Sequence, residues 1–502
     1  MTATATAPAE RTSFFDEQAR RRRGARRLGL VCLVLAAGVG AVLSTLLGPL
    51  ILLAVAGALR LLAALGVAPG IMSAGLRVVE VWVREGIAAL SRGADLVGAA
   101  ATLQQGLATL PLFGRAALLL LPGMVAAMLL WACLARFHRN TAAAAAAAGL
   151  AAREPRTTDP EERQIGNIVV EIALAAGLPA PRLLLVDAPT VNTAVFGASH
   201  QAATVIVTRG LLDQLDRRET QGLVAHLVAS AGNGDLRLAA SVQAVFVTLG
   251  ALLTLFDLPF RRSAWTALGG LFYAAAGRVS GAEAEAISTS LTTSLTPDSS
   301  EAMLQVMSLV ERWPPLGAFL VAPLLPWMLL TTLQKFIVQM WMLFLFGWPL
   351  ALLWRVRRYL ADAVAVQLTR DPDALAGALG RINGQAGLPP GGAAHELGFV
   401  HTPQASQTKL RERMMVAMPL TPPIGKRLRR LSSLGATGLR FASAFAGLRA
   451  LPPLKLALVL MLLALLVPLV GMLVVLVSGL LVGATALSIA GGLALTSLIL
   501  RL

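Results

Sequence analysis

The sequence predicts a mostly α-helical, polytopic membrane protein with a cytosolic α+β domain that is split by two transmembrane helices. Hydrophobic residues make up 56% of the 502 residues and charged residues 14%, whereas soluble globular chains are nearer to half apolar and a quarter charged. Several apolar runs approach the roughly 20 residues that a helix needs to cross a bilayer. Polar segments with helix and strand patterns lie between these runs.

The charge balance is strongly basic, with a net charge of +16. In a soluble protein this balance would indicate nucleic-acid binding. Here many basic residues cluster beside apolar runs and aromatic residues are only 5%, which is typical of the positive-inside pattern and of anionic lipid headgroups. We therefore expect the lipid bilayer as a partner and no nucleic acid. Cys32 and Cys133 lie within apolar runs, so neither a disulfide framework nor a thiolate zinc site is expected.

The first apolar run, 28–59, directly follows a cluster of six arginines. It is too long for the core of a signal peptide, which has about 7–15 residues, and the arginines fix its N-terminal end in the cytoplasm. The stretch 316–333 contains two prolines and is either a broken span or an interfacial segment. Five further spans are predicted, at 116–135, 238–256, 336–354, 456–478 and 479–500.

Arginine and lysine are frequent in 355–455 and rarer in 257–315, which places these two segments on opposite sides of the membrane. The simplest arrangement has about six helices, give or take one or two, with both termini in the cytoplasm. The expected organisation begins with a basic N-terminus (1–27), a helix pair with an extracytoplasmic loop (28–137) and a first domain part (138–237). A second helix pair with an extracytoplasmic loop (238–354), a second domain part (355–455) and a C-terminal hairpin (456–502) follow.

The first cytosolic part has local patterns of both secondary-structure types. Residues 161–176 have helical spacing and end at Gly177-Leu178-Pro179, while 182–186 and 204–208 are strand-like. Asp216 is a plausible cap for a helix over 218–231. The alanine-rich run 141–152 is expected to continue the second span into the cytosol, since alanine has the lowest cost in a helix.

The helix 218–231 carries the informative residues. Ala225-His226-Leu227-Val228-Ala229-Ser230, followed by Asn233-Gly234-Asp235, resembles the active-site helix of the HtpX-like membrane metallopeptidases, which are relatives of the CAAX prenyl endopeptidases. In that family the helix has the motif A-H-E-x-x-H followed by N-x-D. Two histidines one turn apart bind zinc, and the glutamate between them polarises the attacking water.

Four further segments extend the resemblance over the region from about 160 to 431, in the family's order and with two spans inserted in the middle. Residues 191–197 resemble the family's N-A-F-x-x-G edge strand, and 207–212 resemble its T-x-G-L-L turn. Residues 357–363 resemble the R-E-x-x-A-D-x segment with the third zinc ligand, and 420–427 resemble the T-H-P-P-x-x-x-R element. The resemblance implies a mostly α polytopic membrane protein with a zincin-like cytosolic metallopeptidase domain. It also implies a location in a bacterial inner membrane.

The resemblance places the functional positions residue by residue. His226 stands at the first ligand position, Leu227 at the general base, Ser230 at the second ligand and Arg358 at the third. The histidine of T-H-P-P is Thr421. A catalytic zinc takes three protein ligands and a water, and leucine cannot accept a proton. We therefore expect no catalytic residue and no zinc, with His226 as the sole remaining ligand.

Other family-like positions have structural interpretations. Asn233 and Asp235 are expected to end the motif helix, and Asn192 belongs to the edge strand. Asp362 supports a ligand histidine in the family and is expected here to pair with Arg358 or with His226. The histidines at 395 and 401 are six residues apart, off a common helix face, so they are not expected to bind metal.

Three functions are weighed from these residues. The first is an inactive pseudopeptidase that binds or regulates membrane proteins or a partner peptidase, in the context of protein quality control, with an edge strand at 192–196 that accepts a peptide by β-augmentation. The second is an active zinc-dependent membrane metalloendopeptidase with an atypical ligand set. The third is a channel or transporter, which the near absence of ionisable residues in the spans argues against.

Overall fold

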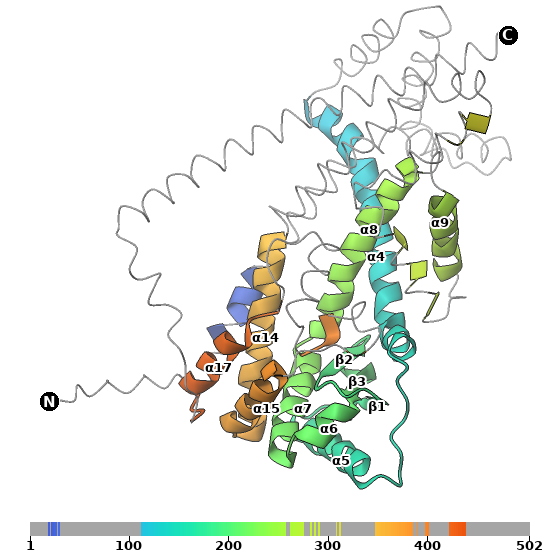
Figure 1. The fold of residues 1–502 in the computed structure, drawn as a ribbon. Helices are drawn as coiled ribbons and strands as arrows, with labels where there is room; N and C mark the ends of the chain where they lie inside the picture. The colour runs from blue at the N-terminus through green and yellow to red at the C-terminus, as the bar shows by residue number, and fades with distance from the viewer. Residues whose placement is uncertain are drawn as a thin grey trace, which may run out of the picture.

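The computed structural model describes residues 112–257, 262–275, 347–384, 397–400 and 421–437, with short pieces between 19 and 30, 282 and 291, and 308 and 312, and residue 389. Two long helices, α4 (Leu112–Gly149) and α8 (Asp235–Asp257), lie side by side and extend from a small α+β domain (Figure 1). The predicted spans 456–478 and 479–500 lie outside the described residues, as do nearly all of 28–59 and most of 336–354.

Helices α4 and α8 contain two of the predicted spans. Within the described residues, one segment, Asp235–Thr254 of α8, is long and apolar enough to cross a membrane by length and composition, and 67% of its window is buried inside the structure. Helix α4 contains the predicted span 116–135 and continues, as predicted, into the alanine-rich run 141–152, where it ends at Gly149. Four large apolar side chains of α4 are exposed along one helical face: Leu121, Val125, Met128 and Leu129.

The sheet has three strands in the order β1-β3-β2: β1 (Arg182–Val186), β2 (Thr193–Gly197) and β3 (Ala203–Thr208). The central strand β3 runs parallel to β1 and antiparallel to β2. Because alternate residues of a strand point to opposite faces, Val205 and Val207 join the core with helices α5 and α7, whereas Ile206 packs towards the alanine-rich end of α4. Both faces of the sheet are therefore covered (Figure 1).

The main helices of the first domain part begin at side-chain caps that the sequence contains. Helix α5 (Pro160–Ala175) starts after Asp159, whose carboxylate accepts hydrogen bonds from two backbone amides of the first turn. Helix α7 (Arg217–Gly232) starts with a capping box between Asp216 and Glu219. The predicted helices at 161–176 and 218–231 are confirmed to within one residue at each end. Two short helices, η1 (His200–Ala202) and α6 (Arg209–Gln214), flank β3.

Both outer edges of the sheet are paired with other parts of the chain. Arg153 forms an antiparallel bridge with Leu185 on β1, and Phe399 forms one with Ala194 on β2. The amide of Val400 also donates to the carbonyl oxygen of Thr193 at 2.9 Å. The expectation that 192–196 offers an open edge for strand addition is therefore wrong at Thr193 and Ala194, because residues from a distant part of the sequence already pair there.

The second domain part packs against the motif helix. Helices α14 (Gly347–Thr369) and α15 (Pro372–Gly384) contact α7, and α17 (Ile424–Ser433) contacts α14 and α15. Helix α14 runs without a break through residue 354, where the predicted span ends. Gly222 allows the approach of α15, since a Cβ there would lie 2.6 Å from the amide nitrogen of Leu375. A further helix, α9 (Arg262–Ala275), lies beside α4 and α8.

Candidate functional site

The candidate site lies where α7, α14 and α17 meet around His226. The imidazole of His226 is fully buried, and its Nδ1 lies 2.8 Å from Oδ1 of Asp362 on α14. Arg427 on α17 is 1% exposed and binds both oxygens of the same carboxylate, with Nη2 at 2.6 Å and Nε at 2.9 Å. Its third nitrogen donates to the carbonyl oxygen of Val400. Three buried side chains from segments far apart in the sequence thus form one cluster.

The hydrogen bonds of this cluster fix the state of the imidazole. Asp362 accepts from Nδ1 of His226, so the other ring nitrogen, Nε2, carries the lone pair. Within the described residues Nε2 is buried without a hydrogen-bond partner. Burial lowers the pKa of His226 to about 4, with added effects of the positive charges of Arg427 and Arg358, and these outweigh the opposing effect of Asp362. Burial opposes ionisation of Asp362, but Arg427 and His226 hold its pKa well below the usual range.

The two positions that follow His226 on α7 are occupied by residues with other roles. Leu227 is fully buried in the hydrophobic core. The hydroxyl of Ser230 donates to Oδ2 of Asp235 at 2.6 Å, and the other oxygen of that carboxylate accepts from Arg357. Neither side chain is therefore oriented as a general base or a metal ligand.

Arg358 on α14 is a buried guanidinium, 2% exposed, in the same charged region. Its Nη2 donates to the carbonyl oxygens of Leu397 at 2.7 Å and Phe399 at 2.8 Å. Burial lowers its pKa to about 10, so the group remains charged at neutral pH. Arg358 therefore holds the backbone of the segment 397–400, which in turn covers the outer edge of β2.

The remaining predicted positions have structural contacts. The side chain of Asn192 accepts a hydrogen bond from the amide of Thr193, just before β2. Asn233 is the C-cap of α7, as predicted, and Gly234, with φ of +85°, turns the chain into α8 at Asp235. Thr421 is buried just before α17. The histidines at 395 and 401 lie outside the described residues.

Of the two partners expected for Asp362, the structure selects His226, and Arg358 instead donates to backbone carbonyls. The second partner, Arg427, was missed. It is the arginine of the segment that resembles T-H-P-P-x-x-x-R, and the single signal for its role was its fixed place in that segment.

Comparison with known proteins agrees with this arrangement. The sequence pattern of peptidase family M48 matches residues 159–434, which is more than half of the chain and contains all the residues of the candidate site. The chain belongs to peptidase family M48. The resemblance to HtpX-like peptidases is confirmed by curated relatives as well, while no solved structure matches the chain.

The similar curated relatives include three that are each named "Protease HtpX homolog". The protein from Dictyoglomus thermophilum is 30% identical over 283 residues, which are 56% of this chain and 72% of the relative. That from Dictyoglomus turgidum is 30% identical over 46% of this chain and 56% of the relative. That from Caldanaerobacter subterraneus subsp. tengcongensis is 27% identical over 55% of this chain and 74% of the relative.

The donor set around His226 does not fit the catalytic zinc that the HtpX resemblance implies. Such a zinc takes three protein ligands, and the described part of this M48 chain contains no group of three His, Cys, Asp or Glu side chains placed to hold a metal. Nε2 of His226 has a lone pair without a partner among the described residues, but the carboxylates of Asp362 and Asp235 are already bound by Arg427 and Arg357.

The buried state of His226 predicts a pH dependence of stability. The unfolded chain takes up a proton at its ordinary pKa of 6.5, whereas the folded protein does so at about 4. The neutral His226 therefore contributes its full share of the free energy of unfolding above pH 6.5. This share, about 3 kcal/mol in total, is lost as the pH falls to about 4. Thermal unfolding in detergent should show a smaller loss of stability over this range for His226→Gln than for the unmodified protein. Equal losses would contradict a neutral buried imidazole, since the buried His138 is common to both proteins.

Proposed function

We propose that this M48 chain is a membrane-embedded pseudopeptidase that hydrolyses no peptide bond and binds or regulates membrane proteins, among them membrane-protein substrates or a partner peptidase. The observation that carries the proposal is the buried guanidinium of Arg358, which stands where the HtpX resemblance places the third zinc ligand. No zinc cofactor is proposed. The substrate or partner is a membrane protein because the domain itself is joined to apolar helices.

The charge balance of the site supports this proposal. Two buried carboxylates, Asp362 and Asp235, already face the guanidiniums of Arg427 and Arg357. Arg358 adds a further positive charge and, among the described residues, has no carboxylate in hydrogen-bond contact. Burial is the main cause of the lowered pKa of His226, and the positive charges of Arg427 and Arg358 add to it. A dication at Nε2 would meet the same repulsion, doubled by its charge.

Membrane embedding rests on two features of the described helices. Helix α8 has the length and composition of a span, and α4, which packs on it, exposes Leu121, Val125, Met128 and Leu129. These four residues have i, i+4, i+7 and i+8 spacing, so they form one apolar stripe suited to lipid. We propose an integral protein of the bacterial inner membrane with the M48 domain and both termini in the cytoplasm.

A specific observation also favours a second candidate, an active zinc-dependent metalloendopeptidase with an atypical ligand set. Asp362 orients His226 through Nδ1 and leaves Nε2 without a partner among the described residues. That arrangement is typical of a metal-binding histidine whose other nitrogen is held by a carboxylate. The two candidates differ in metal content and in catalysis.

The test is zinc analysis of the purified full-length protein by mass spectrometry, together with cleavage of β-casein with and without EDTA. The pseudopeptidase predicts well below one zinc per chain, the same content in His226→Ala, and no cleavage that EDTA removes. About one zinc per chain, lost in His226→Ala, together with EDTA-sensitive cleavage, would refute it and establish the second candidate. Retention in membranes after alkaline carbonate washing tests the membrane embedding separately.

A further inference from the structure

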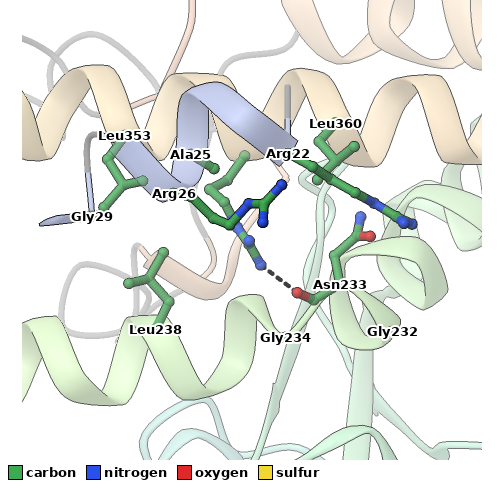
Figure 2. Close-up of a pocket in the computed structure, with 11 residues that line it drawn as sticks. Arg22, Ala25, Arg26, Gly29, Gly232, Asn233, Gly234, Leu238, Leu353 and Leu360 are labelled. Carbon is green, nitrogen blue, oxygen red and sulfur yellow. Dashed lines mark hydrogen bonds between the residues drawn. The ribbon is translucent and has the colours of Figure 1, made fainter. Parts of the chain in front are cut away.

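A cavity lies beside the turn that ends the motif helix. It has a volume of about 570 Å³ and is formed by three parts of the chain: the N-terminal piece, the turn Gly232–Gly234 with Leu238 of α8, and α14. This volume is in the range of small-molecule sites. Figure 2 shows the side chains of Arg22 and Arg26 directed from the N-terminal piece towards the turn around Asn233.

The N-terminal piece presents one helical face to this cavity. Its lining residues are Arg22, Ala25, Arg26 and Gly29, whose i, i+3, i+4 and i+7 spacing places them on the same side of a helix. Ala25 is buried, with 7% exposed. This face of the N-terminal piece therefore packs against α14. Of the six N-terminal arginines, Arg22 and Arg26 line the cavity.

The polar groups that line the cavity are donors. Arg22 and Arg26 have no carboxylate partner within the part of the chain that the structure describes, and no acidic side chain lines the cavity. The side-chain amide nitrogen of Asn233 is buried without a hydrogen-bond partner among the described residues. Arg357 also lines the cavity, with its charge shared with Asp235. Guanidinium and amide donors around one space suit a phosphate group.

The remaining walls are apolar and lie at the end of the candidate span. Leu238, Leu353 and Leu360 line the cavity, and Leu238 stands in the first turns of the apolar segment Asp235–Thr254. The cavity therefore lies at the depth where the helices of an embedded protein enter the headgroup region. A phosphate beside apolar walls at that depth is the chemistry of a phospholipid headgroup with its glycerol.

We propose that this cavity binds the phosphodiester headgroup of an anionic phospholipid, with Arg22 and Arg26 on the phosphate and the leucines against the glycerol. The proposal rests on the membrane embedding proposed above but not on the absence of zinc. It gives the chain a lipid site formed partly by the turn between α7 and α8. Arg357 links this site to Asp235 and Ser230 of the candidate functional site.

The experiment measures lipid binding to the full-length protein in detergent by native mass spectrometry, with dioleoylphosphatidylglycerol and dioleoylphosphatidylcholine as probes. The unmodified protein should bind the first phosphatidylglycerol more tightly than phosphatidylcholine. Arg22→Gln/Arg26→Gln should weaken that binding by about tenfold or more. The matched control is Arg23→Gln/Arg27→Gln, which removes the same charge from positions of the same piece that do not line the cavity and should change binding less than about twofold.

Equal weakening by both variant pairs, or equal affinity for the two lipids, would overturn the proposal, because either result indicates diffuse charge attraction. Millimolar inorganic phosphate and glycerol phosphate form a competition arm. Displacement of the lipid by either compound would assign the site to a free phosphate compound and overturn the lipid assignment. If the pocket variant stays in carbonate-washed membranes and its lipid binding is unchanged, the failure belongs to this site and not to the membrane embedding.

Discussion

The combined variant Leu227→Glu, Ser230→His and Arg358→Glu is expected to bind about one zinc per chain, where the unmodified protein binds none. Asp362 already holds His226 through Nδ1 and leaves Nε2 free among the described contacts. Asp235, which now accepts from Ser230 at 2.6 Å, would be placed to accept from an imidazole at that position. The change at Arg358 replaces a positive charge by a ligand carboxylate.

Zinc per chain, measured by mass spectrometry after gel filtration in zinc-free buffer, checks this result. Adding His226→Ala to the triple variant is the control and should remove the metal, since two ligands and a base remain. Leu227→Glu alone should bind none. A folded triple variant that stays free of zinc would show that these positions do not converge as the HtpX resemblance implies. That result would also remove the main support for the pseudopeptidase.

Arg427→Met is expected to destabilise the fold by about 3–5 kcal/mol, because it leaves the buried carboxylate of Asp362 without its charged partner. Arg427 is 1% exposed and donates two hydrogen bonds to Asp362 and one to Val400. The loss should appear as a lower unfolding temperature of the full-length protein in detergent. The control is Lys426→Met, which removes one positive charge from an exposed neighbouring residue. This substitution should change the unfolding temperature little.

A double variant makes this prediction specific to the pair. Replacing both partners, as in Asp362→Leu/Arg427→Met, removes the uncompensated charge and should recover part of the lost stability. Full additivity of the two single effects would indicate that Arg427 acts through packing and not through the Asp362 carboxylate.

The sequence predicted the elements whose signals are local. The strand at 182–186 has the predicted bounds, and α7 begins at the Asp216 cap because its capping box is complete within four residues. The predicted end of a span at residue 354 does not correspond to the end of a helix. Hydropathy falls there because arginines follow Trp354, yet a change of composition does not interrupt the backbone hydrogen bonds of a helix, and α14 continues to Thr369.

The candidate site was predictable where a family motif fixed the spacing. Asp362 was expected to pair with Arg358 or with His226, and it pairs with His226. The role of Arg427 was not, because it lies 201 residues from His226, and a pairing of that kind depends on how α17 docks. The cover of β2 by Phe399 had no sequence signal either, since one bridge and one amide leave no periodic pattern.

The two bridges at the rims of the sheet also affect how copies of this chain meet one another. An open strand edge recruits strands from other molecules and leads to aggregation. Here Arg153 and Phe399 interrupt the rims of β1 and β2. The segment with Phe399 is held by two hydrogen bonds from Arg358. Because Arg358 holds the segment that covers the outer edge of β2, we expect the loss of that hold to favour strand pairing between copies of the chain.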